Sequence, residues 1–253
     1  MGKSPNAEFS DDRGIMQCIT GLSQDVFNVV LKCNLELETI DSRIDDAIKY
    51  FRSRRISLLW HTGLLSEPKD IGKYLEARGF PHDYDLKAMA VDLDSIDDSF
   101  DSSEGVAVKS VIEYHESKSW AECLASSWES PIETVPWMLN NAYFNPSIEK
   151  GIEKSLPMRM YLGALEGKPV STSMLIWNDE IAGLEMVGTI PSARGMGGGT
   201  AIVKAALSDA SSMGFKFVVV LSTIEGVKLY EKCGFKTYGK LPEYWMNFNN
   251  SQP

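Results

Sequence analysis

The sequence holds few cysteines and histidines, and this scarcity argues against two kinds of site. Its 253 residues include three histidines and four cysteines, Cys18, Cys33, Cys123 and Cys233. The cysteines are scattered and form no C-x-x-C pair, so we expect neither a disulfide framework nor a zinc site. We therefore expect a cytoplasmic protein with reduced thiols and no bound metal.

Long apolar runs are also missing, and basic residues are in the minority. No stretch approaches the roughly 18–20 apolar residues that span a bilayer, and the polar residues 1–6 are unlike a signal peptide. Lys and Arg number 25 against 35 Asp and Glu, which gives a net charge of −10. Because phosphate backbones need clustered cations, we expect no nucleic-acid partner. Because long apolar runs are missing, we expect no membrane partner.

A polar, acidic and serine-rich stretch at residues 92–104 divides the chain. Such a composition is typical of a linker, so we expect two domains, at 1–103 and 104–253. A long surface loop within one domain is the alternative interpretation. The apolar content of 43% is ordinary for a globular chain of this kind.

The spacing of apolar residues predicts an α/β (α+β) protein. Short turns join the apolar runs at 158–165, 170–177 and 180–190, so we expect an antiparallel meander there. The other expected strands lie at 56–60, 82–93, 105–111, 215–221 and 235–246. The expected helices lie at 25–30, 44–51, 70–79, 120–128, 132–141, 200–213 and 225–233.

A glycine-rich loop between a strand and a helix carries the clearest chemical signal. It reads Arg194, Gly195, Met196, Gly197, Gly198, Gly199 and Thr200. Glycines let the backbone approach a ligand closely, and the N–H groups at a helix start favour anions. A P-loop would need a lysine after Gly199, and a Rossmann fingerprint would need glycine where Thr200 stands. A plain tight turn is the remaining alternative.

Two motifs resemble those of the GCN5-related N-acetyltransferase (GNAT) family. Arg194, Gly197 and Gly199 match its acetyl-CoA motif [Q/R]-x-x-G-x-[G/A], with Pro191 shortly before. Residues 229–235, LYEKCGF, match its L-Y-x-K-x-G-F segment. The resemblance covers residues 104–253. It implies an enzyme that moves an acetyl group from acetyl-CoA directly to a primary amine of a small molecule or peptide. A non-enzymatic acyl-CoA sensor is the alternative, and a homodimer is left open.

The first half contains a fainter copy of the second motif. Residues 73–80 read KYLEARGF and residues 228–235 read KLYEKCGF. The first half therefore resembles a degenerate GNAT-like unit. The resemblance implies that each half is a mixed, mostly antiparallel sheet flanked by helices. Leu75 stands where Tyr230 stands in the second half, and no R-x-x-G-x-G precedes it. We expect this unit not to bind acetyl-CoA and to have a role in shaping the substrate site.

The resemblance also implies residues that contact the cofactor. The loop from Arg194 to Thr200 would hold the diphosphate of acetyl-CoA through its N–H groups. Val187, Gly188 and Thr189 would line the pantetheine arm, and the N–H of Val187 or Gly188 would meet the developing oxyanion. We expect the strand to bulge or splay near Gly188. Thr223 stands where the family often has an Asn that contacts CoA, so this contact is open.

Two residues are the expected acid and base. Glu185 is the first candidate to take a proton from the amine. The alternative interpretation is that Glu185 is only a solvent-facing residue of a strand. Tyr230 matches the family's general-acid tyrosine. The alternative interpretation is that Tyr230 only packs against its neighbours on an amphipathic helix. Glu225 is a weaker candidate base, because an acidic residue at a helix start is favoured by the helix dipole alone.

Overall fold

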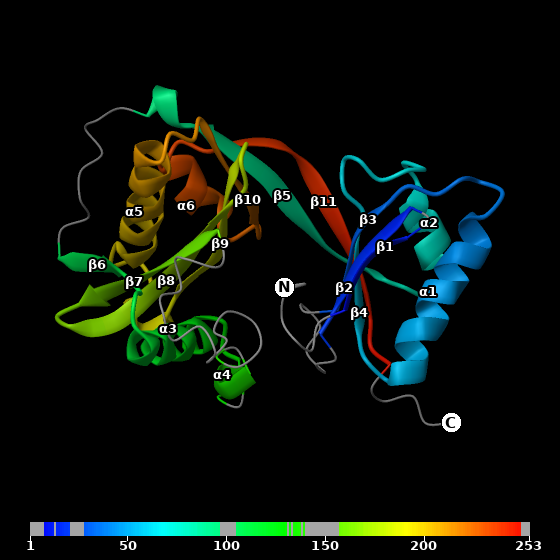
Figure 1. Ribbon diagram of the computed structural model, residues 1–253, viewed down its shortest axis with the longest axis horizontal. Coiled ribbons are helices and arrows are strands. Elements are labelled where there is room, and N and C mark those ends of the chain that lie inside the picture. The colour runs from blue at the N-terminus through cyan, green and yellow to red at the C-terminus, as the bar shows by residue number, and fades with distance from the viewer. Residues whose placement is uncertain are drawn as a thin grey trace. The chain divides into compact units, whose positions relative to one another are not determined.

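The chain forms two compact units, described here by a computed structural model (Figure 1). The structure describes residues 8–12, 14–20, 28–96, 105–130, 132, 134–137, 139 and 157–248. One unit comprises Met1–Leu86 together with Gly239–Pro253, and the other comprises Lys87–Tyr238. We call them unit 1 and unit 2.

The sheet of unit 2 has strand order β5-β10-β9-β8-β7-β6. Its strands are β5 (His82–Asp92), β6 (Val106–Ser110), β7 (Met158–Leu165), β8 (Lys168–Trp177), β9 (Ala182–Thr189) and β10 (Phe217–Ser222). Only β9 and β10 pair in parallel, while all other neighbours are antiparallel. The expected meander is thus present, and β7 has the predicted bounds.

Helices cover both faces of this sheet (Figure 1). They are α3 (Tyr114–Ser127), α4 (Thr134–Trp137), α5 (Gly198–Ser212) and α6 (Val227–Lys232). Along β7, Met160 and Leu162 pack in the core beneath α3, whereas Tyr161 packs in the core beneath α5. Side chains alternate between the faces of a strand, so a strand covered on both sides reads as a continuous apolar run.

Unit 1 repeats this plan with fewer elements. Its strand order is β1-β2-β3-β4-β11, and only β3 and β4 pair in parallel. The strands are β1 (Glu8–Asp12), β2 (Ile15–Ile19), β3 (Val29–Cys33), β4 (Leu58–His61) and β11 (Lys236–Met246). Helices α1 (Ile40–Arg54) and α2 (Ile71–Glu76) supply one face of its core, with Ile44, Phe51 and Leu75 fully buried.

The unit boundaries differ from the predicted division at 103/104. Residues Lys87–Asp92 of β5 pair with β10, and residues Glu243–Met246 of β11 pair with β4. Met89 and Val91 consequently pack in the core of unit 2, and Tyr244 packs in that of unit 1. The last strand of each half therefore completes the unit built mainly from the other half, which a division by sequence position does not anticipate.

The repeated motif folds in the same way in both halves. Gly79 follows α2 with φ +83°, and Gly234 follows α6 with φ +89°. Each is followed by a buried phenylalanine, Phe80 or Phe235, and then by a strand. Only glycine adopts this φ without strain, so the glycine ends the helix and the phenylalanine anchors the turn in the core.

Three expectations for local structure need correction or fall outside the described residues. The helix expected at 25–30 is wrong at Val29 and Val30, which are buried in strand β3 because β-branched residues suit a covered sheet. Strands β1 and β2 were not predicted. The helix expected at 132–141 is described only over Thr134–Trp137, and residues 97–104 of the expected linker lie outside the described residues. None of the described helices has the length and apolarity of a membrane span.

Candidate functional site

The glycine-rich loop lies at the start of α5, where the sequence places it. A short 3₁₀ helix, η6 (Pro191–Ala193), follows β9, and α5 begins at Gly198, two residues before the predicted start. Gly195 and Gly197 have φ values of +82° and +86°, which favour glycine strongly. Because Gly197 is the N-cap residue, no side chain there caps the first N–H groups of the helix.

The glycines of this loop have two different physical roles. A Cβ on Gly199 would lie 3.1 Å from Leu229 Cδ2, and a Cβ on Gly198 would lie 3.3 Å from Ser171 Oγ. These two glycines therefore let α5 start tightly against α6 and β8. A Cβ on Gly195 would meet nothing within 4 Å, and Met196 is 55% exposed. Thr200 is buried, whereas Gly195 is exposed at the surface of the loop.

The side chain of Arg194 reaches the end of α3 rather than the start of α5. Its Nη2 donates to the carbonyl oxygen of Ser127 at 3.0 Å and to Glu129 Oε1 at 3.3 Å. Its Nε donates to the carbonyl oxygen of Thr189 at 3.4 Å. A cation is favoured at a helix C-terminus, where carbonyl groups lack partners. Arg194 thus connects α3, β9 and the glycine-rich loop.

Strand β9 separates from β10 after its first residues. Six residue pairs join β9 to β8, from Ala182 with Trp177 to Thr189 with Ser171. Only two pairs join β9 to β10, Ala182 with Val218 and Gly183 with Val219. The later residues of β9, which include Val187–Thr189, therefore border a gap in the ladder. A strand edge without a ladder partner can pair with an added extended chain.

A bulge interrupts β9 just before these residues. Thr172 of β8 pairs with Gly188 and Met174 pairs with Glu185, so Met186 and Val187 lie opposite a single residue of β8. Met186 has φ +52°, and the Thr172 hydroxyl donates to its carbonyl oxygen at 3.0 Å. We expected a bulge or splay near Gly188, and the structure has both, with the bulge centred at Met186.

Gly188 serves a close approach of α3 to the sheet. A Cβ at this position would lie 2.9 Å from Ser127 Cβ and closer still to the Ser127 hydroxyl. Real Cβ atoms essentially never come this near, so no side chain fits without movement of α3. Ser127 is also the residue whose carbonyl Arg194 binds. The end of α3 is therefore fixed against β9 at two points.

Glu185 and Tyr230 are brought within electrostatic reach of each other. Tyr230 is only 6% exposed, and its ring meets that of Phe235 edge to face at 5.4 Å between centroids. Burial raises the pKa of the Tyr230 hydroxyl well above its usual range, and the negative charge of Glu185 is the second cause. Glu185 itself is half-buried on β9. A neutral phenol beside a carboxylate is an arrangement that can serve an acid and a base.

Thr223 lies in the turn between β10 and α6. Its hydroxyl oxygen accepts the N–H of Gly226 at 3.4 Å, and its carbonyl oxygen accepts the Ser222 hydroxyl at 2.7 Å. Both Thr223 and Glu225 are exposed. The hydrogen bond from Gly226 to the Thr223 hydroxyl forms a turn of the kind that Ser and Thr side chains favour. The only sign of this turn in the sequence is the adjacent pair Ser222 and Thr223.

The described residues of unit 1 contain no equivalent of the glycine-rich loop. Its α1 follows β3 as α5 follows β9, but the connection contains Glu36 and Glu38 and no glycine. Asp41 occupies the first turn of α1. Carboxylates favour a helix start but repel a diphosphate there. The helix start of unit 1 therefore differs in charge from that of unit 2, and the absence of acetyl-CoA binding in the first half stays a prediction.

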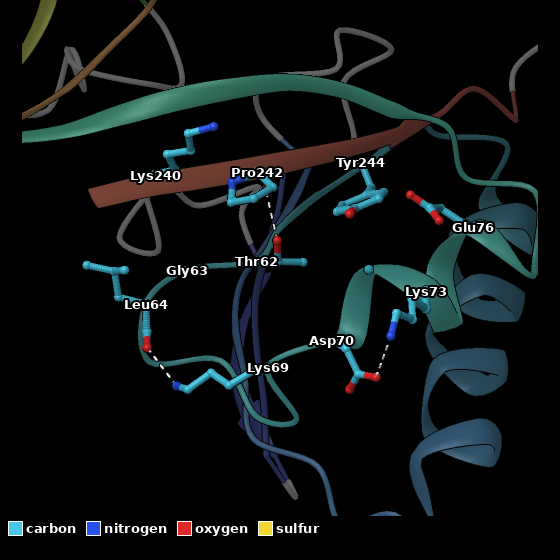
Figure 2. A pocket seen from close by; sticks show the side chains of 11 residues that line it. Thr62, Gly63, Leu64, Lys69, Asp70, Lys73, Glu76, Lys240, Pro242 and Tyr244 are labelled. Atoms are coloured by element: carbon cyan, nitrogen blue, oxygen red, sulfur yellow. Dashed lines mark hydrogen bonds and ion pairs between the residues drawn. The ribbon is translucent and has the colours of Figure 1, made fainter. Parts of the chain in front are cut away.

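A separate pocket of about 450 Å³ lies in unit 1, between the end of β4, helix α2 and strand β11 (Figure 2). No sequence motif predicts this pocket. Three lysines line it, and each has an acidic partner: Lys69 with Glu67 (Nζ–Oε1 2.7 Å), Lys73 with Asp70 (Nζ–Oδ2 3.3 Å) and Lys240 with Asp85 (Nζ–Oδ2 2.9 Å). Glu76 adds a further carboxylate near Tyr244 (Figure 2). Because the charges compensate one another, the lining favours no particular class of ligand.

The sequence of unit 2 matches a known family. Residues 120–235 match the Acetyltransferase (GNAT) family. A comparison with curated proteins finds no match.

Several solved structures share the fold over nearly the whole chain. A GCN5-related N-acetyltransferase from Kribbella flavida has 13% identity and a TM-score of 0.70, over 95% of this chain and 89% of that one. A tandem GNAT protein from the clavulanic acid biosynthesis pathway has 13% identity and a TM-score of 0.60, over 98% and 86%. A glucosamine N-acetyltransferase region of a fungal multi-domain β-N-acetylglucosaminidase has 12% identity and a TM-score of 0.66, over 96% and 33%. The predicted arrangement of two GNAT-like units is thereby confirmed as a fold.

Proposed function

Because residues 120–235 are a domain of the acetyltransferase (GNAT) family, we propose that this protein transfers the acetyl group of acetyl-CoA directly to a primary amine. The acceptor is a small molecule or a peptide. One observation carries the proposal: the uncapped, glycine-rich start of α5 lies directly after a strand that bulges and separates from its neighbour. The first feature suits a diphosphate, and the second suits an extended pantetheine arm.

The loop from Arg194 to Thr200 would hold the cofactor mainly through its backbone. Gly195 and Gly197 hold the chain in a conformation that only glycine adopts readily, and Gly195 borders open space. The N–H groups from Gly198 to Thr200 begin a helix of 15 residues, whose dipole favours an anion. Arg194 would contribute indirectly, by fixing the loop to α3.

The acetyl group would then lie beside β9. Val187, Gly188 and Thr189 border the gap where β10 has separated, so the pantetheine arm can run along them. The N–H of Val187, just after the bulge, would donate to the thioester oxygen as it gains negative charge. Thr223, in the exposed turn after β10, would contact the arm through its hydroxyl.

Transfer forms a C–N bond and breaks a C–S bond, and an acceptor in its ammonium form gives up two protons. The first leaves before the attack, passes to Glu185 and is later released to water. The second leaves the nitrogen after the attack and replaces the proton that Tyr230 gives to the CoA sulfur. An amine with a pKa near ~10.4 must lose a proton before it attacks, and Glu185 is the proposed acceptor of that proton. Tyr230, held neutral by burial, is the proposed donor to the departing CoA sulfur.

The two groups would assist each other. The negative charge of Glu185 is one cause of the raised pKa of Tyr230. When Glu185 takes up the proton of the amine, this cause disappears, and the phenol becomes a better donor. The proton would thus become available at Tyr230 at the stage when the thiolate leaves.

The test is release of the CoA thiol from acetyl-CoA with a panel of amines. The panel contains diamines, amino acids, short peptides and amino sugars, the last because one structure of similar fold is described as a glucosamine N-acetyltransferase region. Thiol release that depends on one class of amine, with acetylated amine found by mass spectrometry, would support the proposal.

A pair of matched variants separates the loop from general stability. Gly195 and Gly214 flank α5, have φ values of +82° and +85°, and would each place a Cβ in open space. Ala at either position carries a similar backbone strain, of the order of 1 kcal/mol. We expect Gly195→Ala to weaken acetyl-CoA binding at least about tenfold and Gly214→Ala to leave it unchanged. Equal affinities in both variants would contradict the proposed cofactor site.

The same experiments distinguish the enzyme from a non-enzymatic acyl-CoA sensor. Acetyl-CoA binding that depends on Gly195, without thiol release on any amine of the panel, would support a sensor in place of an enzyme.

A further inference from the structure

One side chain of the neighbouring strand controls the peptide group that follows the bulge. We propose that Thr172 is a positioning residue, which aims the backbone N–H of Val187 at the thioester carbonyl of the acetyl donor. The inference deepens the proposed acetyl transfer and depends on it. Thr172 belongs to β8 and lies outside both sequence motifs of the family.

The carbonyl group of Met186 is the point of contact. The Thr172 hydroxyl donates to this oxygen at 3.0 Å. At the bulge, Met186 and Val187 together face one residue of β8, and Met186 has φ +52°. A residue with a side chain seldom adopts this conformation, so something must hold it there. The Thr172 hydrogen bond is a direct means of doing so.

Peptide geometry then fixes the direction of the next N–H group. The peptide bond from Met186 to Val187 is trans, since the one cis bond among the described residues lies between Glu67 and Pro68. In a planar trans peptide, the C=O and the N–H point in opposite directions. If the oxygen of Met186 points towards Thr172 on β8, the N–H of Val187 points away from β8. That side of β9 is the one where pairing with β10 has ended.

Packing alone does not explain a hydroxyl group at the position of Thr172. Ser171, Thr172 and Ser173 are consecutive and all fully buried in the middle of β8. Burying a hydroxyl is costly unless it forms a hydrogen bond, and an apolar side chain would fill the same space without this cost. Of the three, Thr172 makes a hydrogen bond at 3.0 Å, Ser173 contacts the carbonyl of Ile202 at 3.5 Å, and the Ser171 hydroxyl has no partner among the described residues.

Three variants of β8 test the proposal by kinetics. Thr172→Val keeps the shape and removes the donor, Thr172→Ser keeps the donor, and Ser173→Ala removes a neighbouring hydroxyl. We expect Thr172→Val to lower kcat about 10- to 100-fold, while the Kd for acetyl-CoA changes less than about threefold. Thr172→Ser should retain kcat within about threefold, and Ser173→Ala should resemble the wild type. Should Thr172→Val fail to fold, Thr172→Ala removes the same hydroxyl and carries the same expectation.

A spectroscopic measurement needs no acceptor and separates this inference from the proposed function. The infrared band of the thioester carbonyl is recorded for ¹³C-labelled acetyl-CoA bound to each variant. A hydrogen bond to the carbonyl lowers its frequency, so we expect a lowered band in the wild type and in Thr172→Ser. In Thr172→Val the band should return towards its value in water-free solvent.

Each outcome decides between the two claims. If the wild type binds acetyl-CoA and the band and kcat are the same in Thr172→Val, the positioning role is overturned while the acetyltransferase remains. If no amine is acetylated but the band still depends on the Thr172 hydroxyl, the positioning role stands and the transfer does not. If acetyl-CoA does not bind at all, both fail.

Discussion

Replacing Gly188 with alanine tests the packing of α3 on β9, on which the candidate site depends. A Cβ at this position would lie 2.9 Å from Ser127 Cβ and 3.4 Å from Thr172 Oγ1, and nearer still to the Ser127 hydroxyl. Ser127 is in the last turn of α3 and its hydroxyl is bound to the carbonyl of Leu124, so it cannot simply turn away. Overpacking of this kind costs about 1–3 kcal/mol. We expect Gly188→Ala to lose about 2 kcal/mol of unfolding free energy.

A double-mutant cycle separates the energy of the clash with Ser127 from other effects of Gly188→Ala on stability. Ser127→Gly removes both atoms that the new Cβ would meet, at a cost of up to about 1 kcal/mol for a glycine at the helix end. If the clash is real, the double variant should be more stable than the two single effects predict, by at least about 1 kcal/mol. Urea denaturation followed by tryptophan fluorescence gives the four free energies.

Two results would refute this reasoning. One is a Gly188→Ala variant with the stability of the wild type. The other is a cycle whose effects simply add, because Ser127 would then not be the group that the new Cβ meets. In either case α3 would lie farther from β9 than the structure places it.

Three other predictions concern charges and proton transfer. Lys109 and the N–H groups of Ile112 and Glu113 lower the pKa of Glu116 from 4.5 to about 2. The stabilisation of the folded state by ionised Glu116 is full above pH 4.5 and is lost as the pH falls towards 2. Glu116→Gln should therefore lower the free energy of unfolding by up to about 3 kcal/mol at pH 7 and by little near pH 2. A loss of stability in urea that does not depend on pH would contradict this prediction. Tyr230→Phe should lower kcat about 10- to 100-fold with acetyl-CoA affinity retained, and wild-type turnover at pH 7 would dismiss the acid role. Glu185→Gln removes a negative charge that raises the pKa of Tyr230, so ¹³C-tyrosine NMR should find that pKa lowered. The variant also lacks the proposed base, so its pH–rate profile should move to higher pH. No change in either measurement would dismiss Glu185 as the base.

The elements of unit 2 could be predicted because their signals are local. The strand at 158–165 was predicted with the bounds that the structure gives, since an apolar run ends there at the Glu166-Gly167 turn, where both residues have positive φ. The helix after the glycines follows from apolar residues at helical spacing, among them Val203, Ala206 and Ala210, which are buried. Periodicity and turn residues depend only on neighbours in the sequence, so they can be read without a structure.

Pairings between distant segments could not be predicted in this way. Nothing local in residues 87–92 distinguishes pairing with β10 from pairing with β4, because an alternating apolar strand fits either sheet edge. The same holds for residues 243–246, which pair with β4. The boundary at 103/104 was placed by composition, whereas the division of the structure into two units depends on these two pairings.

The candidate site was predicted in part. The loop at 194–200 and Tyr230 follow from their motifs, and the structure places both on the expected elements. The partner of Arg194 and the bulge at Met186 depend on contacts with α3 and β8, far away in the sequence. One signal was available and was missed: three polar residues, 171–173, in the centre of an otherwise apolar strand conflict with the pattern around them. Such local conflicts are expected at functional sites.

Calorimetric titration of the full chain with acetyl-CoA tests the central claim most directly. Unit 2 has the glycine-rich helix start, whereas the corresponding helix of unit 1 begins among Glu36, Glu38 and Asp41. We therefore expect saturable binding of one acetyl-CoA per chain, with a Kd in the micromolar range that is typical of enzyme substrates. No heat of binding, or binding that is unchanged in Gly195→Ala, would contradict the account.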